Sequence, residues 1–194
     1  CLKQNVRIRG LYRRSIWNAE GCDGRWSEAS CALIPDDFDD IAATARGYAS
    51  ADYYGMGMMP AGSGTVGFLW PFRHSLPRTP GRETGIYGAC DVALTYQSAP
   101  GARWLHMPGR PDFIAHTQVP WGSGGVYTAS CPVEIGDEQR LYFSGARFTH
   151  GYGLDSNWKA VPEQQQEVAD QGLARIGFAR WPKNRLFGFR SDPA

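Results

Sequence analysis

The chain has 194 residues, a length that suits a single domain with a sizeable buried core. Twenty Lys and Arg against nineteen Asp and Glu leave a formal net charge of +1, and the arginines form no basic run. Charge therefore gives no reason to expect nucleic acid or an anionic membrane as a partner, and no apolar stretch reaches the roughly 20 residues of a membrane-spanning helix. The 24 glycines and the 13% aromatic content are typical of an all-β protein with tight turns.

Most of the chain is predicted to form β-strands in pairs, each closed by a short turn. The predicted strands cover residues 11–17, 26–33, 54–61, 65–72, 89–97, 104–108, 126–135, 139–147, 172–179 and 185–190. An acidic segment between the first two pairs lacks β alternation, and a helical turn is predicted there near Asp40 to Arg46. A second short helix is predicted over residues 164–170.

A hairpin pattern recurs three times, with an aromatic residue on each of its two strands. The expected aromatic pairs are Trp17 with Trp26, Tyr96 with Trp104, and Phe178 with Phe187. The first members of these pairs lie 79 and then 82 residues apart. A regular period of matched strand pairs predicts stacked or radially arranged sheets rather than one compact α/β core.

Long loops alternate with tight turns along the predicted strands, which is the layout of a β-propeller blade. We therefore expect an all-β fold of two to three four-stranded antiparallel blades and no second domain. The expected blade segments are residues 1–35, 50–108 and 120–192. In such a propeller the long loops share one face, where substrate contacts are expected because tight turns mainly close hairpins.

Five cysteines are present, and none forms a Cys-x-x-Cys pair, which argues against a zinc site. Cys22 and Cys31 flank one predicted strand and have the spacing for a bridge, although free thiols in strands are the favoured state. We also expect this chain to be part of a longer protein.

Three stretches resemble the five-bladed β-propeller glycoside hydrolases, the superfamily of invertases, levanases and arabinanases. They read DYYGMGMMPAGSGTVGFLWPFRH, CDVALTYQSAPGARWLHMPGRPDFI and GSGGVYTASCPVEIGDEQRLYFSG, and they cover about two thirds of the chain. The resemblance implies that the chain is one part of a five-bladed propeller. It also implies that the remaining blades and a C-terminal β-domain belong to the same full-length protein, and that this protein is secreted or periplasmic.

The resemblance further implies hydrolysis of an oligo- or polysaccharide by paired carboxylates, without a cofactor. One carboxyl group protonates the glycosidic oxygen, while a second activates water or attacks the sugar from the opposite face. Two alternatives stay open, a non-catalytic carbohydrate-binding propeller and a protein-interaction propeller without affinity for sugars.

Asp52 is the predicted catalytic carboxylate, because it stands just before an expected inner strand. Four substrate contacts are predicted at the same rim: Arg73, His74, Trp121 and His150. His74 and His150 follow equivalent strands of consecutive units, which makes the pair more suggestive than either residue alone. Each of these residues also has a plain structural interpretation, as a turn cap, a surface group or a packed ring.

Two further features bear on activity. The segment Trp121–Gly125 lacks the acid that the hydrolases commonly carry after this tryptophan, which favours the binding module. Four aspartates crowd the acidic loop, at Asp36, Asp37, Asp39 and Asp40. They suit either a structural Ca²⁺ or plain solvated charge, and we predict no metal because their spacing is not that of an EF-hand.

Overall fold

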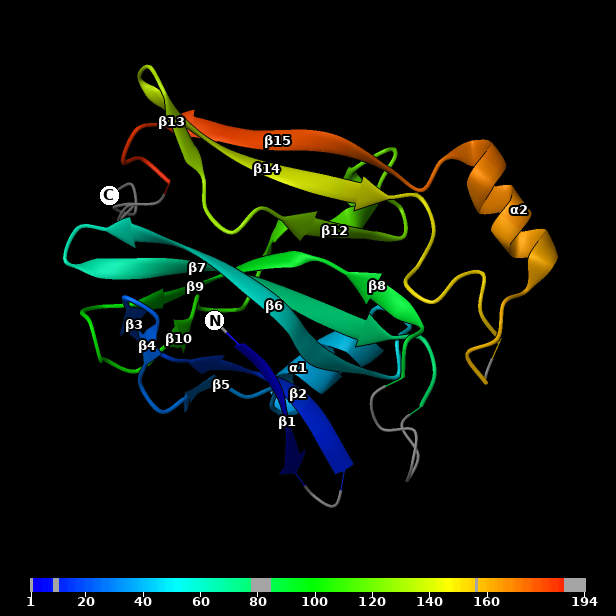
Figure 1. Cartoon of the computed structure of the whole chain (residues 1–194), viewed down its shortest axis with the longest axis horizontal. Helices are drawn as coiled ribbons and strands as arrows, with labels where there is room; N and C mark the ends of the chain where they lie inside the picture. The colour runs from blue at the N-terminus through cyan, green and yellow to red at the C-terminus, as the bar shows by residue number, and fades with distance from the viewer. Residues whose placement is uncertain (1, 9–10, 78–84, 156, 187–194) are drawn as a thin grey trace, which may run out of the picture.

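The computed structural model describes residues 2–8, 11–77, 85–155 and 157–186. Antiparallel strands dominate, none of the sheets closes into a barrel, and the all-β prediction is confirmed. Figure 1 shows three layers, with the middle sheet lying between the first and the third. The predicted helical segments form α1 (Asp37–Thr44) and α2 (Pro162–Gln171), and a 3₁₀ turn covers His116–Gln118.

The first sheet has the strand order β1-β2-β5. Its strands are β1 (Leu2–Ile8), β2 (Leu11–Asn18) and β5 (Ser30–Leu33), with a small hairpin of β3 (Gly21–Cys22) and β4 (Arg25–Trp26) between the last two. The expected pairing of Trp17 with Trp26 is wrong. Trp17 pairs with Leu2 and Cys31, because the positive φ angles of Asp23 and Gly24 close a tight turn that pairs Trp26 with Gly21. Cys31 carries a free thiol, and the side chain of Cys22 lies outside the described part of the chain.

The middle sheet is an up-and-down sheet whose later strands are interrupted. Its strands are β6 (Ser50–Ala61), β7 (Gly64–His74), β8 (Gly88–Cys90), β9 (Val92–Gln97), β10 (Leu105–His106) and β11 (Asp112–Ile114). Both β8 and β9 pair with β7 in one register, and both β10 and β11 pair with β9. The expected match of Tyr96 with Trp104 is off by one residue, since Tyr96 pairs with Leu105.

The third sheet is also antiparallel. It contains β12 (Gly125–Thr128), β13 (Val133–Ile135), β14 (Glu138–Ala146) and β15 (Ala174–Pro182), with β14 in the centre. Each of the other three strands pairs with the same strand, β14. The predicted partner of Phe178, Phe187, lies outside the described residues.

Alternate side chains of the middle sheet enter two different cores, as the period of two in a strand requires. Phe68 of β7 is buried with Val126 and Leu141 of the third sheet. Its neighbour Leu69 is buried with Ile16 and other residues of the first sheet. The middle sheet is therefore covered on both faces, and this sandwich positions the ends of β6 and β7.

The four crowded aspartates are explained by helix α1. Asp36 caps the helix by accepting hydrogen bonds from the backbone of Phe38 and Asp39, and the Asp39 side chain accepts one in return from the Asp36 backbone. Carboxylates in a first turn also complement the positive end of the helix dipole. Asp37 also lies in this first turn, and Asp40 forms an ion pair with Arg13 of β2.

Candidate functional site

Chemically versatile side chains meet where β6 begins and β7 ends. Asp52 lies opposite Phe72 in the ladder, so Asp52 and His74 are diagonal neighbours on one face of the sheet. We call the group that assembles here the β6–β7 cluster. Its members are Arg13, Arg14, Asp52, Tyr54, Phe72, His74 and His150.

A β-bulge aims Tyr54 into the cluster. The ladder register shifts between Tyr53 and Met56, so Tyr54 and Gly55 together face Trp70. A Cβ atom at Gly55 would come within 2.6 Å of the Trp70 ring, so only glycine fits there without a shift of the ring. Bulges redirect single side chains in this way, and they are frequent beside functional sites.

Asp52 is fully enclosed. Its carboxylate accepts a hydrogen bond from Nε2 of His74 at 2.8 Å and lies 3.6 Å from Nε of Arg13. Arg13 is itself anchored through two hydrogen bonds to Asp40, at 2.9 and 3.0 Å. None of the Asp52 side chain is exposed to solvent. This geometry gives Asp52 a positioning role and not the direct substrate contact expected of a catalytic acid.

His150 is held in one orientation by four hydrogen bonds. Its backbone exchanges two with Gly88, and Nδ1 lies 2.5 Å from the carbonyl oxygen of Ile86. Because a carbonyl only accepts, Nδ1 carries the proton. With the proton on Nδ1, Nε2 accepts the hydroxyl hydrogen of Tyr54 at 2.8 Å.

His74 and His150 are brought together, although they lie on different sheets or loops. Both rings stand edge-on to Phe72, with centroid distances of 5.0 and 5.4 Å. The two histidines that we expect at one rim therefore lie against the same aromatic ring. His74 is buried and His150 is half-buried, so His150 is the one that a ligand can reach.

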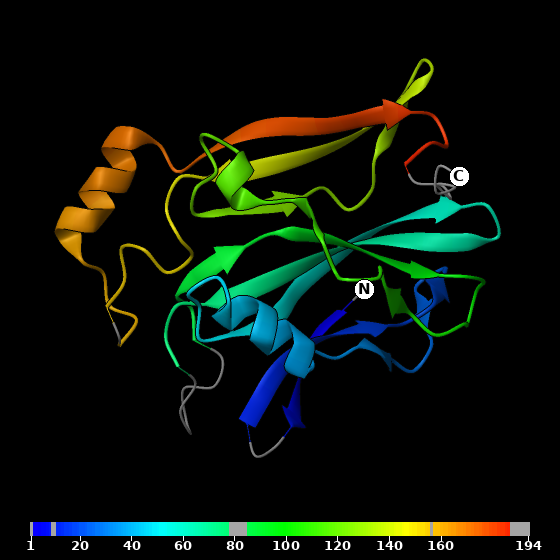
Figure 2. The same ribbon diagram turned by 180° about the vertical axis from the view of Figure 1, so that it is seen from behind.

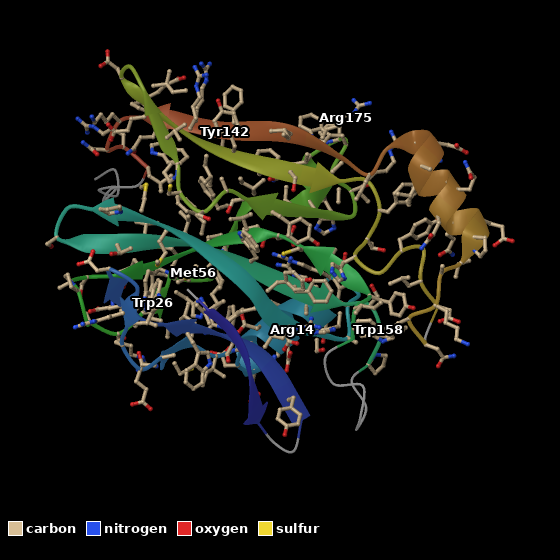
Figure 3. The ribbon with its side chains drawn as sticks, viewed as in Figure 1. Arg14, Trp26, Met56, Tyr142, Trp158 and Arg175 are labelled. Carbon is tan, nitrogen blue, oxygen red and sulfur yellow. The ribbon has the colours of Figure 1, made fainter. Side chains whose placement is uncertain are left out.

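Arg14 covers the cluster from the first sheet. Its guanidinium carbon lies 5.5 Å from the ring centre of Tyr54 and 5.7 Å from that of Phe72, which are cation–π distances. Burial lowers the pKa of Arg14, and the nearby Asp52 opposes this effect. Figure 3 shows Arg14 where β2 crosses β6.

Half-buried rings continue from the cluster towards the third sheet. Tyr127 of β12 stands edge-on to Tyr54 at 6.1 Å and to Trp70 at 5.9 Å, and the indole nitrogen of Trp70 donates to Thr128. Burial raises the pKa of Tyr127, so its hydroxyl stays protonated at neutral pH. Tyr54, Trp70 and Tyr127 thus form a partly exposed aromatic wall.

Arg73 lies outside the cluster. Its side chain alternates to the other face of β7, where it pairs with Asp91 and with Asp112 at 2.9 Å. Asp91 also accepts hydrogen bonds from the backbone and ring of His116. Burial, and then the positive charge of Arg73, lower the pKa of His116. These contacts give Arg73 a structural environment beneath α1 and not the predicted position at a sugar.

Trp121 is also separate from the cluster. A Cβ atom on Gly145 or Gly177 would come within 3.0 Å of its ring, so the indole lies flat on glycines of the third sheet. It packs against the buried residues between the middle and third sheets. The structure therefore gives Trp121 a packing environment and not the predicted place beside Asp52.

Among the residues that the structure describes, no group of three or more His, Cys, Asp or Glu is arranged to hold a metal ion. The same residues include no helix long and apolar enough to cross a bilayer. Cys90 is buried as a free thiol, and desolvation raises its pKa, so it is not a poised nucleophile.

Sequence reasoning missed Arg14, Tyr54 and Tyr127. Tyr54 carried a usable signal, because it stands two residues after Asp52 in a predicted strand and so shares its face. The adjacent Arg13 and Arg14 were a second signal, since two charges inside an otherwise buried strand need partners. Nothing local in the sequence indicated Tyr127.

A scan against protein-family models, a search of the curated proteins and a search of the solved structures each found no match for this chain. The resemblance to the propeller glycoside hydrolases rests on the sequence stretches quoted above.

Proposed function

We propose that the chain is part of a five-bladed β-propeller of the glycoside-hydrolase type, and that it binds an oligo- or polysaccharide at the β6–β7 cluster. The observation that carries the proposal is the convergence of His74 and His150 on Phe72. The two histidines follow the second strands of consecutive sheets. A radial arrangement of blades brings such equivalent positions to one mouth.

The chemistry of the accessible groups suits a sugar. The half-buried rings of Tyr54, Trp70 and Tyr127 offer apolar surface to a sugar ring, and the hydrogen-bonded pair of Tyr54 and His150 places polar atoms beside them. Asp52 fixes His74 and Arg13, and these in turn fix the base of the cluster.

The enclosure of Asp52 favours the non-catalytic binding module over hydrolysis within this segment. Acid/base cleavage needs two carboxyl groups that reach the glycosidic bond, about 5 Å apart for retention or about 6.5 to 9.5 Å for inversion. Asp52 has no exposed surface to offer. In a hydrolase, the reacting carboxylates would come from other blades of the propeller.

The test is calorimetric titration of the protein with neutral hexasaccharides of glucan, arabinan, fructan and xylan. Tyr54→Phe removes the hydroxyl group that donates to His150, and we expect roughly tenfold weaker binding from the loss of that polar contact and of the ordering of His150. Tyr142→Phe is the matched control, because Tyr142 lies on the exposed face of the third sheet. Equal affinities of the two variants would refute the proposed site, and release of reducing sugar would identify a hydrolase.

A further inference from the structure

A second concave region lies on the side of β6 to which Tyr53 points, opposite to Asp52 and Tyr54. One cavity of about 1160 Å³ is bordered by β5, the first turn of α1 and β10. A second cavity of about 640 Å³ adjoins it, and the two share Cys31, Ala32, Arg103 and Trp104. Together they form one groove along the seam between the first and middle sheets. Helix α1, which borders the larger cavity, faces the viewer in Figure 2.

The size and shape of this groove favour a chain-like ligand. Pockets for single small molecules are usually about 300 to 1,000 Å³ in volume. The larger cavity alone exceeds that range, and the second extends it along the seam. A ligand of several linked units would fill such a groove, whereas one small molecule would leave most of it empty.

A hydrogen-bond relay fixes the ionisation and tautomer of His106 in the wall of the groove. The Tyr53 hydroxyl donates to the Asp39 carboxylate at 2.7 Å, since a carboxylate only accepts. The Tyr53 oxygen therefore accepts from Nε2 of His106 at 3.0 Å. Burial and the adjacent Arg110 lower the pKa of His106, so the ring is neutral at pH 7. Its Nδ1 atom is left with a lone pair and, within the described part of the chain, no donor.

Trp104 supplies a second polar atom without a partner. This residue is 5% exposed, it borders both cavities, and its buried Nε1–H has no acceptor among the described residues. A buried donor without an acceptor is costly, and such groups mark places where a water or ligand oxygen completes the structure.

The walls of the larger cavity carry balanced charge beside apolar surface. Asp36 is paired with Arg110, and Asp40 is paired with Arg13. The two remaining charged groups of this cavity, Asp37 and Arg103, are of opposite sign. The second cavity adds one acid, Glu20, so the groove has no large excess of charge to select an ionic ligand, and the exposed Phe38 adds an aromatic surface.

We propose that this groove is a second carbohydrate site, which holds a neutral oligosaccharide chain with His106 Nδ1 accepting from a sugar hydroxyl and Phe38 contacting a sugar ring. The choice of sugar as the ligand class rests on the proposed function, whereas the groove and its polar atoms do not. The site would hold a further part of a polymeric substrate, and Arg13 borders both this groove and the β6–β7 cluster.

An extended peptide is the competing occupant, because β5 and β10 are both edge strands. The free edges are short, with four residues in β5 and two in β10, which gives an added strand few backbone partners. The aromatic and hydroxyl-accepting groups of the wall favour the sugar.

Two phenylalanines provide a matched test. Phe38 and Phe178 are each 47% exposed, and each has an arginine carbon 5.0 Å from its ring centre, Arg110 and Arg140 respectively. Only Phe38 borders the groove, so truncation of the two side chains has a comparable structural cost but a different effect on binding. We expect Phe38→Ala to weaken binding of the neutral hexasaccharides roughly tenfold and Phe178→Ala to leave it unchanged.

Hydrogen–deuterium exchange with the bound hexasaccharide separates this proposal from the first one. The groove predicts protection of residues 30–40 and 103–110, and it predicts that this protection persists in Tyr54→Phe. Protection confined to residues 50–54 and 85–90, or no binding by any member of the panel, would overturn the groove proposal. Protection of the groove by an unmodified extended peptide but by none of the sugars would also overturn it, in favour of strand addition. If Tyr54→Phe binds the sugars as tightly as Tyr142→Phe does while the groove is still protected, the proposed function is refuted and the groove proposal stands.

Discussion

The side chains of the β6–β7 cluster hold one another in position. Asp52 contacts His74 and Arg13, while His150 is oriented by Ile86 and holds the hydroxyl group of Tyr54. A buried carboxylate of this kind is tolerated only because it is paired, and removing its charge weakens the contacts that hold His74 and Arg13. The buried Asp52 therefore maintains the geometry of its more exposed neighbours in the cluster.

The first prediction at this scale concerns Asp52→Asn. The change leaves Arg13 buried beside a neutral amide, and we expect a loss of about 3 kcal/mol in the free energy of unfolding. Urea denaturation measures it. Asp137→Asn, in an exposed turn, is the control and should change stability by less than about 0.5 kcal/mol. An unchanged midpoint for Asp52→Asn would show that the carboxylate is not held as described.

A second prediction concerns pH and His106. Its pKa is lowered in the folded protein by burial and by Arg110, with Asp39 and Asp36 opposing the shift, so the unfolded chain binds its proton first as the pH falls. The contribution is complete above the ordinary value of 6.5 and is lost as the pH falls through the lowered pKa, at about 1.4 kcal/mol for each unit of difference.

Stability measured between about pH 7 and pH 5.5 should therefore decline less in His106→Gln than in the wild type. The glutamine amide can still donate to Tyr53, which separates the charge effect from the hydrogen bond. Parallel pH profiles for the two proteins would contradict the assignment.

At the scale of single elements, the bulge in β6 connects the backbone to the site. It exists because Gly55 and Tyr54 share one partner position opposite Trp70. We expect Gly55→Ala to force the Trp70 ring away and to cost about 1 to 3 kcal/mol of stability, with weaker sugar binding because Tyr54 is redirected.

Gly85→Ala is the control for this change. Its new Cβ would meet its nearest neighbour, Nδ1 of His74, at an ordinary 3.7 Å, and Gly85 has no positive φ. Thermal unfolding and titration with sugar report the two effects separately. Equal behaviour of the two alanine variants would mean that the bulge does not depend on glycine.

The strands and helices themselves were largely predictable, because their signals are local. The turn at Gly62 and Ser63, the apolar run in β7 and the polar break before α1 follow from turn chemistry and residue pattern. The pairing of Trp17 was not predictable, since a two-residue turn inserted a small hairpin between β2 and β5.

The site was predictable only in part. His74 and His150, which were predicted together, both contact Phe72. The burial of Asp52, by contrast, depends on Arg13 arriving from another sheet, and Arg73 was diverted by Asp91 and Asp112 from later strands. Such long-range charge pairing leaves no trace in local spacing.

At the scale of the whole molecule, three successive antiparallel sheets lie face to face, and the middle one is covered on both sides. The outer face of the third sheet exposes apolar residues, among them Tyr142, Ile176 and Phe178. A further sheet of the same kind would cover that face in a propeller, which agrees with the proposed architecture.

The central claim is that this stack of sheets gathers the ends of equivalent strands into one sugar-binding mouth. A crystal structure of the protein with the tightest-binding neutral hexasaccharide tests it most directly. The account predicts a sugar hydroxyl within hydrogen-bond distance of the Tyr54 oxygen and a sugar ring against Tyr54, Trp70 or Tyr127. A saccharide bound elsewhere, with the β6–β7 cluster filled only by water, would contradict it.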